Sequence, residues 1–279
     1  MQTRAEVSQE PGPDQQSTAG RRFALEGRVA IVTGGAGALG SEISIGLAQH
    51  GADVAVTDLR QEAAGEVAER IGRLGRRAFT MPCDVRDAEQ VNAAVAGTVE
   101  ALGRLDIVVH TAGVASLTPL VEMPVEQFQQ TLLSCLTGGF LVCRAAAEQM
   151  IRQGEGGSMV LISSIAGARA LGRGTGAYAA AKAGLNALVR ELAVELAPQG
   201  IRVNAVAPCQ FMTPALEVVL NDRRHGGREK LGAKMIARIP VGRFGQPEDL
   251  VGPCVFLASR AASMVTGQVL FVDGGYTAQ

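Results

Sequence analysis

The sequence is poor in the residues that mark disulfide-bonded and metal-binding proteins. It has no tryptophan and three histidines among 279 residues, and its five cysteines are scattered without any Cys-x-x-Cys pair. The histidines, at positions 50, 110 and 225, also lack the spacing of metal ligands. This pattern argues against a disulfide framework and against structural zinc. We therefore expect free thiols, no bound metal and a cytoplasmic protein.

Long apolar runs and blocks of one charge are missing as well. No run approaches the roughly 20 apolar residues of a membrane-spanning helix. The formal net charge is −1 and no basic block occurs, so neither nucleic acid nor a membrane is an expected partner. Hydrophobic residues nevertheless make up 47% of the chain, enough for a large core. The expected partner is a small molecule.

The first residues differ in composition from the rest. Residues 1–20 are rich in Gln, Glu, Ser, Pro, Asp and Gly and contain no apolar stretch of the kind found in a secretory signal. We interpret residues 1–23 as a disordered extension ahead of a single domain spanning residues 24–279.

Within that domain, strand-like and helix-like patterns alternate. Such alternation predicts an α/β fold, a single-domain Rossmann-like three-layer sandwich with a parallel sheet and helices on both faces. In this fold ligands bind beyond the carboxyl ends of the strands. The seven strands are expected near residues 28–33, 53–58, 77–81, 105–110, 157–163, 201–206 and 268–272.

A glycine-rich turn follows the first expected strand. The turn, Gly34 to Gly40, leads directly into a helical pattern. Strand, glycine turn and helix form the context of a dinucleotide fingerprint, because glycines allow close approach of the backbone to a pyrophosphate. The helix N-terminus then offers free N–H groups and a partial positive charge to the phosphates.

An acid ends the second expected strand, 18 residues after Gly40. Asp58 at this position accepts hydrogen bonds from the ribose hydroxyls and repels a 2′-phosphate, which favours NAD over NADP. Arg60, two residues further on, is the alternative reader, because an arginine here would serve a phosphate. NAD is the predicted cofactor.

Small and polar residues also follow the next three strands. Ala112-Gly113 allows the adenosine half of a cofactor to lie against the backbone. Asp84 is placed to accept a hydrogen bond from the adenine amino group, since Asp87 is the better N-cap for the helix that begins near Ala88. Ser163-Ser164 ends the fifth strand, where a serine pair is usually a turn or cap.

Tyr178 and Lys182 are four positions apart, so on a helix both side chains emerge from one face. A phenol is a poor acid or base near neutral pH, with an ordinary pKa of about 10. An ammonium one turn away is expected to lower the pKa of that phenol. By itself this spacing is also common on an ordinary helix surface.

Taken together, these motifs resemble the short-chain dehydrogenase/reductase family over nearly the whole chain from about Leu25. The resemblance implies hydride transfer between a nicotinamide and an alcohol or carbonyl carbon. The matching motifs are Thr33-Gly34, Asp58, Asp84-Val85, Ala112-Gly113, Ser163-Ser164, Tyr178/Lys182, residues 201–208, and the closing stretch that includes Gly242-Arg243, residues 247–249, residues 256–259, residues 265–268 and residues 272–275.

The resemblance implies a role for each matched residue. Tyr178 is the general acid/base, Lys182 lowers its pKa and binds the nicotinamide ribose, and Ser164 polarises the substrate oxygen. The span from Ser164 to Tyr178 is 14 positions, one more than the family pattern, so Ser163 or Ile165 is an alternative and an insertion lies within residues 168–176. The implied cofactor-binding residues are Gly34, Gly37, Ala38, Leu39, Gly40, Asp58, Leu59, Asp84, Val85, Ala112, Gly113, Tyr178, Lys182, Pro208 and Thr213.

Four positions depart from the family pattern. Ala38 and Cys209 stand where glycine is usual, and His110-Thr111 replaces a pair of asparagines. Cys135 stands where the family has an asparagine that holds a water linking the lysine to solvent. A thiol is a weaker hydrogen-bonding group than an amide, so the relay is impaired, rerouted through Ser134, or unaffected because Cys135 is a small filler.

The substrate is not fixed by these motifs. Residues 214–238 are expected to form a substrate lid, and Arg169 is a candidate for the pocket mouth. Sugars or polyols, hydroxyacyl groups and cyclic alcohols all fit. The alternatives are a catalytically silent dinucleotide-binding sensor and an NADP-dependent ketoacyl-type carbonyl reductase. The resemblance also implies a homodimer or homotetramer packed through residues 126–152, 177–197 and 269–279.

Overall fold

The computed structural model describes residues 20–114, 117–172, 174–221 and 227–279, and these form one parallel sheet between two layers of helices. The seven strands lie in the order β3-β2-β1-β4-β5-β6-β7, and every pairing is parallel. The strands are β1 (Val29–Thr33), β2 (Asp53–Asp58), β3 (Ala78–Pro82), β4 (Ile107–His110), β5 (Gly157–Ile162), β6 (Ile201–Pro208) and β7 (Val269–Val272). The predicted fold class is confirmed, and each strand begins and ends within two residues of its predicted bounds.

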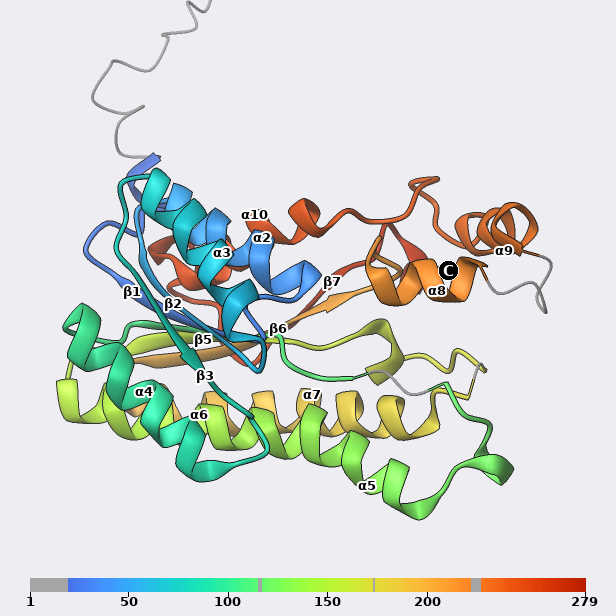
Figure 1. Ribbon diagram of the computed structural model, residues 1–279, viewed down its shortest axis with the longest axis horizontal. Coiled ribbons are helices and arrows are strands. Elements are labelled where there is room, and N and C mark those ends of the chain that lie inside the picture. Colours follow the sequence, from blue (N-terminus) through green and yellow to red (C-terminus); the bar gives the residue numbers. More distant parts are fainter. Residues whose placement is uncertain (1–19, 115–116, 173, 222–226) are drawn as a thin grey trace, which may run out of the picture.

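The central strands are apolar on both faces because helices cover both sides of the sheet. All five residues of β1 and all four of β4 are buried, so these strands read as continuous apolar runs. Helices α2, α3 and α10 cover one face, and α4, α6 and α7 cover the other (Figure 1). The helices are α2 (Ala38–Gln49), α3 (Gln61–Arg73), α4 (Ala88–Leu102), α5 (Val125–Leu132), α6 (Gly138–Gln153), α7 (Gly176–Leu196), α8 (Pro214–Asn221), α9 (Gly227–Ile236) and α10 (Val251–Ala258).

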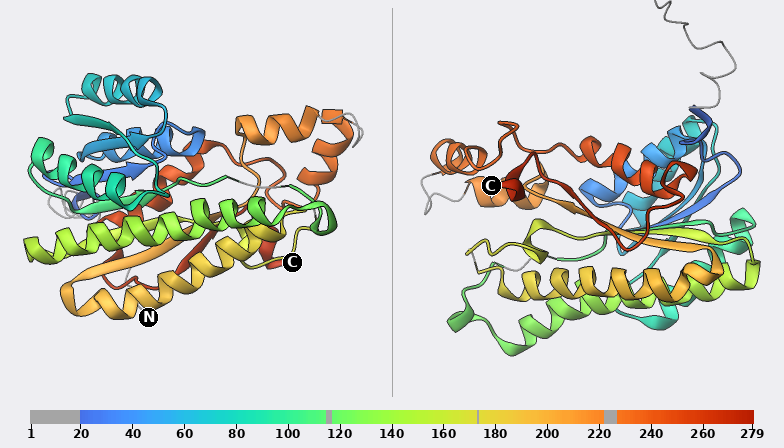
Figure 2. Two further views of the ribbon diagram at one scale, coloured as in Figure 1. Left: turned by 60° about the horizontal axis from the view of Figure 1, so that its bottom comes forward. Right: turned by 180° about the vertical axis from the view of Figure 1, so that it is seen from behind.

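One helical stretch, Val125–Gln153, combines α5, a five-residue π-helical turn at Leu133–Thr137, and α6. By length and composition alone this stretch is long and apolar enough to cross a membrane, yet half of its most apolar window is buried inside the protein. It runs beside α7 on the same side of the sheet, as both views in Figure 2 show. Its apolar residues thus contribute to the core layer.

The chain is already held against the fold before residue 24, where the sequence placed the domain boundary. The carbonyl of Arg22 accepts a hydrogen bond from the backbone N–H of Ala261, and the ring of Phe23 lies 6.4 Å from that of Phe256. Arg22 and Phe23 therefore contact the domain from within the stretch that we predicted as an extension. Its first 19 residues lie outside the described part of the chain.

A buried carboxylate joins the strands at the amino edge of the sheet. Asp106, just before β4, accepts hydrogen bonds from the backbone N–H of Val29 and from the guanidinium groups of Arg28 and Arg104. Although burial alone would raise it, the pKa of Asp106 is lowered because these donors favour the carboxylate. This network links the beginnings of β1 and β4.

The opposite, carboxyl edge carries the loops and short helices that shape the candidate site. Helices α8 and α9 project beyond this end of the sheet, and the C-terminus lies next to them (Figure 1). They fall within the predicted lid at residues 214–238, of which residues 222–226, including His225, lie outside the described part. A small cluster of buried Ile165, Ile239 and Tyr276 joins the lid region to the loop after β5.

Candidate active site

The turn after β1 requires glycine at the positions where its backbone comes closest to other backbone atoms. Gly34 has a φ of +69°, and a Cβ there would lie 2.8 Å from the backbone nitrogen of Ala112. A Cβ at Gly40 would collide with the carbonyl oxygen of Gly34. Ala38, by contrast, begins α2, and among the described residues no non-glycine has a positive φ, so its methyl group is tolerated as predicted.

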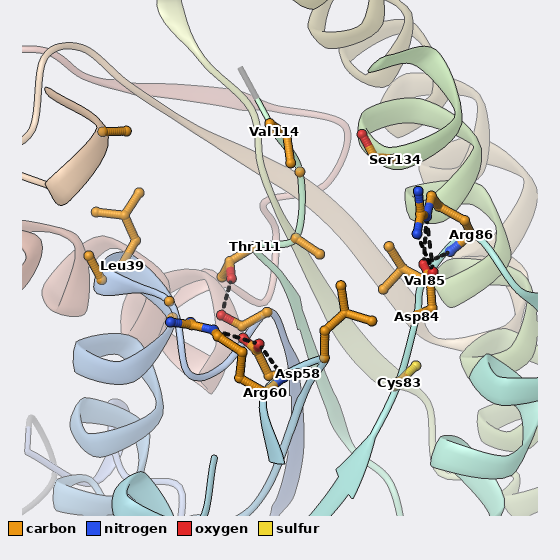
Figure 3. Close-up of a pocket in the computed structure, with 18 of the residues that line it drawn as sticks. Leu39, Asp58, Arg60, Cys83, Asp84, Val85, Arg86, Thr111, Val114 and Ser134 are labelled. Atoms are coloured by element: carbon orange, nitrogen blue, oxygen red, sulfur yellow. Dashed lines mark hydrogen bonds and ion pairs between the residues drawn. The ribbon is translucent and has the colours of Figure 1, made fainter. Parts of the chain in front are cut away.

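A cavity of about 820 Å³ lies beside this turn, over the carboxyl ends of β1 to β4 (Figure 3). This volume falls within the usual range of small-molecule and cofactor sites. Twelve of the fifteen predicted cofactor residues line it, and these are Gly34, Gly37, Ala38, Leu39, Gly40, Asp58, Leu59, Asp84, Val85, Ala112, Gly113 and Thr213. The remaining three, Tyr178, Lys182 and Pro208, are not among its lining residues.

Asp58 lies at the end of β2 on one wall of the cavity and anchors the glycine turn. One carboxylate oxygen accepts from the backbone N–H of Ala36 at 3.1 Å, and the other accepts from the backbone N–H and Nε of Arg60 at 3.0 and 3.3 Å. Arg60 also donates from Nη2 to the carbonyl of Ala36 at 2.8 Å. Asp58 and Arg60, the two alternative determinants of the cofactor in the sequence analysis, are therefore ion-paired.

Asp84 lies on the facing wall, just after β3. Its carboxylate accepts more side-chain hydrogen bonds from its arginine than that of Asp58 does. Arg86 donates to both carboxylate oxygens from Nε and Nη2, and the pKa of Asp84 is lowered chiefly by these side-chain hydrogen bonds. Asp87 accepts from the backbone N–H groups of Glu89 and Gln90, which confirms it as the N-cap of α4. The sequence did not point to Arg86.

His110 and Thr111, which replace the usual asparagines, bind the end of β4 to the glycine turn. The Thr111 hydroxyl donates to the carbonyls of Thr33 and Gly34, and His110 Nδ1 lies 2.8 Å from the Thr33 hydroxyl. Burial, with a smaller contribution from the charge of Lys182, lowers the pKa of His110 to about 3. The imidazole is therefore neutral at physiological pH and acts as a polar link between strands.

The two serines after β5 point to different partners. The Ser163 hydroxyl donates to Asn186 Oδ1 at 2.6 Å, whereas Ser164 accepts from the backbone N–H of Ala166 and hydrogen-bonds Tyr178. Ile165 packs in the apolar cluster with Tyr276. Of the three candidates, Ser164 is thus the one that faces the tyrosine, in spite of the extra residue in the following loop.

Lys182 lies one helical turn after Tyr178 on α7, and its Nζ is 5.6 Å from the centre of the phenol ring. The residue is only 3% exposed, and its ammonium donates to the carbonyl of Ile162 at 2.6 Å. Burial raises the pKa of Tyr178 to about 12, against the lowering effect of the Ser164 hydrogen bond, and burial also lowers the pKa of Lys182. The pKa of Tyr178 therefore lies above its ordinary value, because desolvation of the phenolate outweighs the Ser164 hydrogen bond.

Cys135 occupies the π-helical turn and is completely buried. Its thiol donates to the carbonyl of Val114 at 3.5 Å, and a Cβ on Gly113 would lie 2.9 Å from its sulfur. Gly113 also has a φ of +153°, so both the backbone and the space at this position require glycine. Cys135 also lies close enough to Tyr178 and Lys182 to affect the pKa of each.

Arg169 does not extend freely into the mouth of the site, as the sequence led us to consider. Its Nη2 donates to the carbonyl of Thr277 at 2.6 Å, so it ties the loop after β5 to the C-terminal segment. Near that segment, the guanidinium of Arg238 stacks 5.0 Å from the ring of Tyr276. These contacts connect the predicted lid region, the C-terminus and the loop that bears Ser164.

Several residues that line the cavity were not predicted as cofactor residues. The Asp-x-Arg spacing that Asp84 and Arg86 share with Asp58 and Arg60 was the available signal for Arg86. The residues from the later helices and turns had no such signal, because only the fold brings them to this edge. The additional lining residues are Arg60, Cys83, Arg86, Thr111, Val114, Gln127, Gln130, Thr131, Ser134, Pro214 and Ala215. Within the described ranges, no group of three or more His, Cys, Asp or Glu residues has the arrangement of a metal site.

Comparison with known proteins agrees with this geometry. The protein-family model described as enoyl-(acyl carrier protein) reductase matches residues 34–277. The chain is 42% identical to L-rhamnose 1-dehydrogenase (NAD(P)(+)) of Sphingomonas sp., over 90% of this chain and 96% of that protein. It is 38% identical to D-threitol dehydrogenase of Mycolicibacterium smegmatis, over 91% and 95%. The crystal structure of a gluconate 5-dehydrogenase from Burkholderia cenocepacia, in complex with NADP and tartrate, superimposes with a TM-score of 0.87 at 34% identity and covers 94% of this chain and 99% of its own.

The chain therefore belongs to the short-chain dehydrogenase/reductase family of Rossmann-fold oxidoreductases. The family resemblance read from the motifs is confirmed.

Replacing Cys135 with asparagine tests whether the thiol limits the family's lysine relay. The amide retains a donor for the Val114 carbonyl and adds hydrogen-bonding capacity. We expect kcat to be unchanged or raised by up to about tenfold, the effect of one hydrogen bond, with NADH affinity unchanged. Steady-state kinetics and NADH titration give the two values. A large loss of kcat, with Cys135→Ser as the size-matched control retaining activity, would show that the site is adapted to a small side chain.

Proposed function

We propose that the protein is an NAD-dependent dehydrogenase that oxidises a secondary hydroxyl of a sugar or polyol, with Ser164, Tyr178 and Lys182 as its catalytic residues. The observation that carries the proposal is the convergence of these three side chains at the end of β5 and the start of α7. The substrate class is supported by the names of relatives that act on rhamnose and threitol. Hydroxyacyl and cyclic alcohols are the competing classes.

The residues around the cavity fit a dinucleotide. The glycine turn leaves no room for side chains at Gly34 and Gly40, where a Cβ would collide with the backbone, and α2 begins at its end. We assign the pyrophosphate to this turn and to the N-terminus of α2, the ribose hydroxyls next to the adenine to Asp58, and the nicotinamide carboxamide to Thr213. Bound NAD supplies the acceptor for the hydride that leaves the alcohol carbon.

The chain's own residues move the proton of the substrate hydroxyl. Ser164 orients the hydroxyl by hydrogen bonding, and the phenolate oxygen of Tyr178 accepts its proton as the carbonyl forms. The buried ammonium of Lys182 stabilises the phenolate electrostatically, because little water screens the two charges there. In reduction the same phenol returns the proton to the carbonyl oxygen.

The experiment that tests the proposal is NAD-linked oxidation of a panel of alcohols. The panel contains aldoses, alditols, aldonates, 3-hydroxyacyl thioesters and cyclic secondary alcohols. We expect the highest kcat/KM within the sugar and polyol group. Preference for a 3-hydroxyacyl thioester, together with NADPH-linked reduction of the matching 3-ketoacyl thioester in the reverse direction, would favour the ketoacyl-type reductase. Tight NADH binding without turnover of any compound would favour a sensor.

Asp58 is the proposed determinant of the cofactor. Its carboxylate repels a 2′-phosphate, so the native protein is expected to prefer NAD over NADP by at least about tenfold in kcat/KM. Asp58→Ser removes this charge and leaves Arg60 without its ion-pair partner, so we expect the preference to reverse or vanish. Kinetics with both cofactors measures it. Native preference for NADP would show instead that Arg60 is the reader of the phosphate.

We also propose that the protein assembles as a homodimer or homotetramer. Support comes from apolar side chains that remain exposed on the faces assigned to packing between subunits. Val194 on α7 is 77% exposed, and Leu270 and Phe271 on β7 are more than one-third exposed. Among the described strands β7 pairs with β6 alone, so it forms an edge of the sheet. A partner covering these surfaces removes apolar area from water.

A further inference from the structure

We propose that Arg86 sets the base preference of the dinucleotide site, so that the site accepts a 6-oxopurine such as hypoxanthine nearly as well as adenine. The inference rests on the proposed function, because it concerns the same nucleotide cavity. It follows from how the guanidinium of Arg86 occupies the carboxylate of Asp84, the residue assigned to the adenine amino group.

The Asp84 carboxylate has little capacity left to accept further hydrogen bonds. One of its oxygens accepts from the backbone N–H of Arg86 at 3.0 Å and from Nε at 2.9 Å. The other accepts from Nε at 3.0 Å and from Nη2 at 2.6 Å. A carboxylate offers about four lone-pair positions, and three N–H donors of Arg86 occupy them, with the single Nε hydrogen shared between both oxygens. Such a forked pair is stronger and better oriented than a single contact between charges.

Arg86 is also fixed from a second side. Its Nη1 donates to Oε1 of Gln130 on α5 at 3.2 Å, so the guanidinium bridges the end of β3 and the helix across the cavity wall. All three residues line the cavity, and the pair faces the Asp58 wall across it (Figure 3). The Arg86 side chain is 42% exposed against 20% for Asp84, so an entering base meets N–H groups as well as carboxylate oxygens.

The two purines differ at the edge that would face this pair. Adenine carries an amino donor at C6 and an acceptor at N1, whereas hypoxanthine carries an oxygen acceptor at C6 and an N–H donor at N1. A carboxylate without a partner binds the amino group and repels the 6-oxo oxygen. A carboxylate covered by a guanidinium loses that advantage, and the guanidinium N–H groups are donors for the oxygen. Discrimination between the two bases is therefore weak while Arg86 is present.

The facing wall provides a matched control because it carries the same Asp-x-Arg spacing with a different geometry. Arg60 donates from Nε to one oxygen of Asp58 only, and its Nη2 turns to the carbonyl of Ala36. The Arg60 pair lies at the ribose subsite rather than at the base. Substitution of Arg60 is expected to change the NADP to NAD ratio, and substitution of Arg86 the adenine to hypoxanthine ratio.

The test measures equilibrium binding as well as turnover. Fluorescence titration of the native protein gives Kd for NADH and for reduced nicotinamide hypoxanthine dinucleotide, and displacement of NADH gives Kd for AMP and IMP. For the native protein we expect the two dinucleotides to have Kd values within about fivefold of each other, and likewise AMP and IMP. In Arg86→Ala the preference for adenine should rise at least about tenfold, the effect of one hydrogen bond to a charged group. Ratios of kcat/KM should follow the Kd ratios.

Two further variants separate base preference from folding. Arg86→Lys keeps the charge but loses the fork, so its preference should lie between those of the native protein and Arg86→Ala, with an unchanged midpoint of thermal unfolding. Arg60→Ala should leave the AMP to IMP ratio at its native value. An unchanged ratio in both Arg86 variants, or a native preference for adenine above about 100-fold, would overturn the inference while NADH binding and turnover still support the proposed function. A native protein that binds no dinucleotide would overturn both.

Discussion

Replacing Tyr178 with phenylalanine is expected to lower kcat by about 10² to 10⁴, the range assigned to general acid/base catalysis. The substitution removes the phenolic oxygen and keeps the ring, so the 5.6 Å stacking distance to the Lys182 ammonium need not change. NADH affinity should stay within a few-fold of the native value. Steady-state kinetics and fluorescence titration on the same preparations measure the two effects.

The pH dependence gives this prediction a second readout. Burial raises the pKa of Tyr178 to about 12, so the phenolate fraction in the protein alone is small at neutral pH and grows as pH increases. The native oxidation rate should therefore rise with pH over the alkaline range, and the residual rate of Tyr178→Phe should lack this rise. Ser164→Ala is the companion variant, with lower kcat and nearly native NADH affinity. Near-native turnover by Tyr178→Phe would refute the catalytic assignment.

Replacing Lys182 with alanine is expected to have a still larger effect, because it acts on both turnover and binding. The ammonium is the buried positive charge next to the phenol, and its loss disfavours the phenolate further. It is also the residue assigned to the nicotinamide ribose. We expect kcat to fall by about 10³ or more and the Kd for NADH to rise at least about tenfold.

A fold defect must be separated from this loss, because Lys182 also donates to the carbonyl of Ile162. The thermal unfolding midpoint and the circular dichroism spectrum of the variant serve this purpose. Lys182→Met fills more of the vacated space and should show the same kinetic defect with better stability. Lys234, on α9, provides a control lysine whose alanine variant should keep native turnover. A Lys182 variant that folds and retains native NADH affinity would contradict the ribose assignment.

Sequence patterns were sufficient to predict the strands of the sheet, because parallel strands that helices cover on both faces consist of continuous apolar runs. β1 and β4 are of this kind, and the glycine turn between β1 and α2 has a strong spacing signal. The end of β6 was less well predicted: the strand continues through Pro208, two residues beyond its predicted end. Proline lacks only the N–H donor, and here it is the last residue of its strand.

The features that sequence did not reveal depend on side-chain directions and on contacts between distant segments. Arg169 meets the carbonyl of Thr277, 108 positions later, which no local pattern predicts. Whether the pKa of Tyr178 is raised or lowered depends on how deeply the fold buries the phenol. The helical spacing to Lys182 does not predict that burial. The Arg86 fork is local, yet the sequence alone does not distinguish it from an arginine that faces solvent.

The Asp106 network has a consequence for how such a chain changes during evolution. Its charges join the strands at the amino edge of the sheet, whereas the proposed chemistry takes place at the carboxyl edge. The two edges are about 13 Å apart along β4, from Asp106 to His110, at roughly 3.3 Å per residue. Substitutions separated by such distances usually have additive effects on the free energy of unfolding. A new substrate preference can thus arise from destabilising replacements at the lid, and strengthening the remote amino edge restores the stability without altering the selected activity.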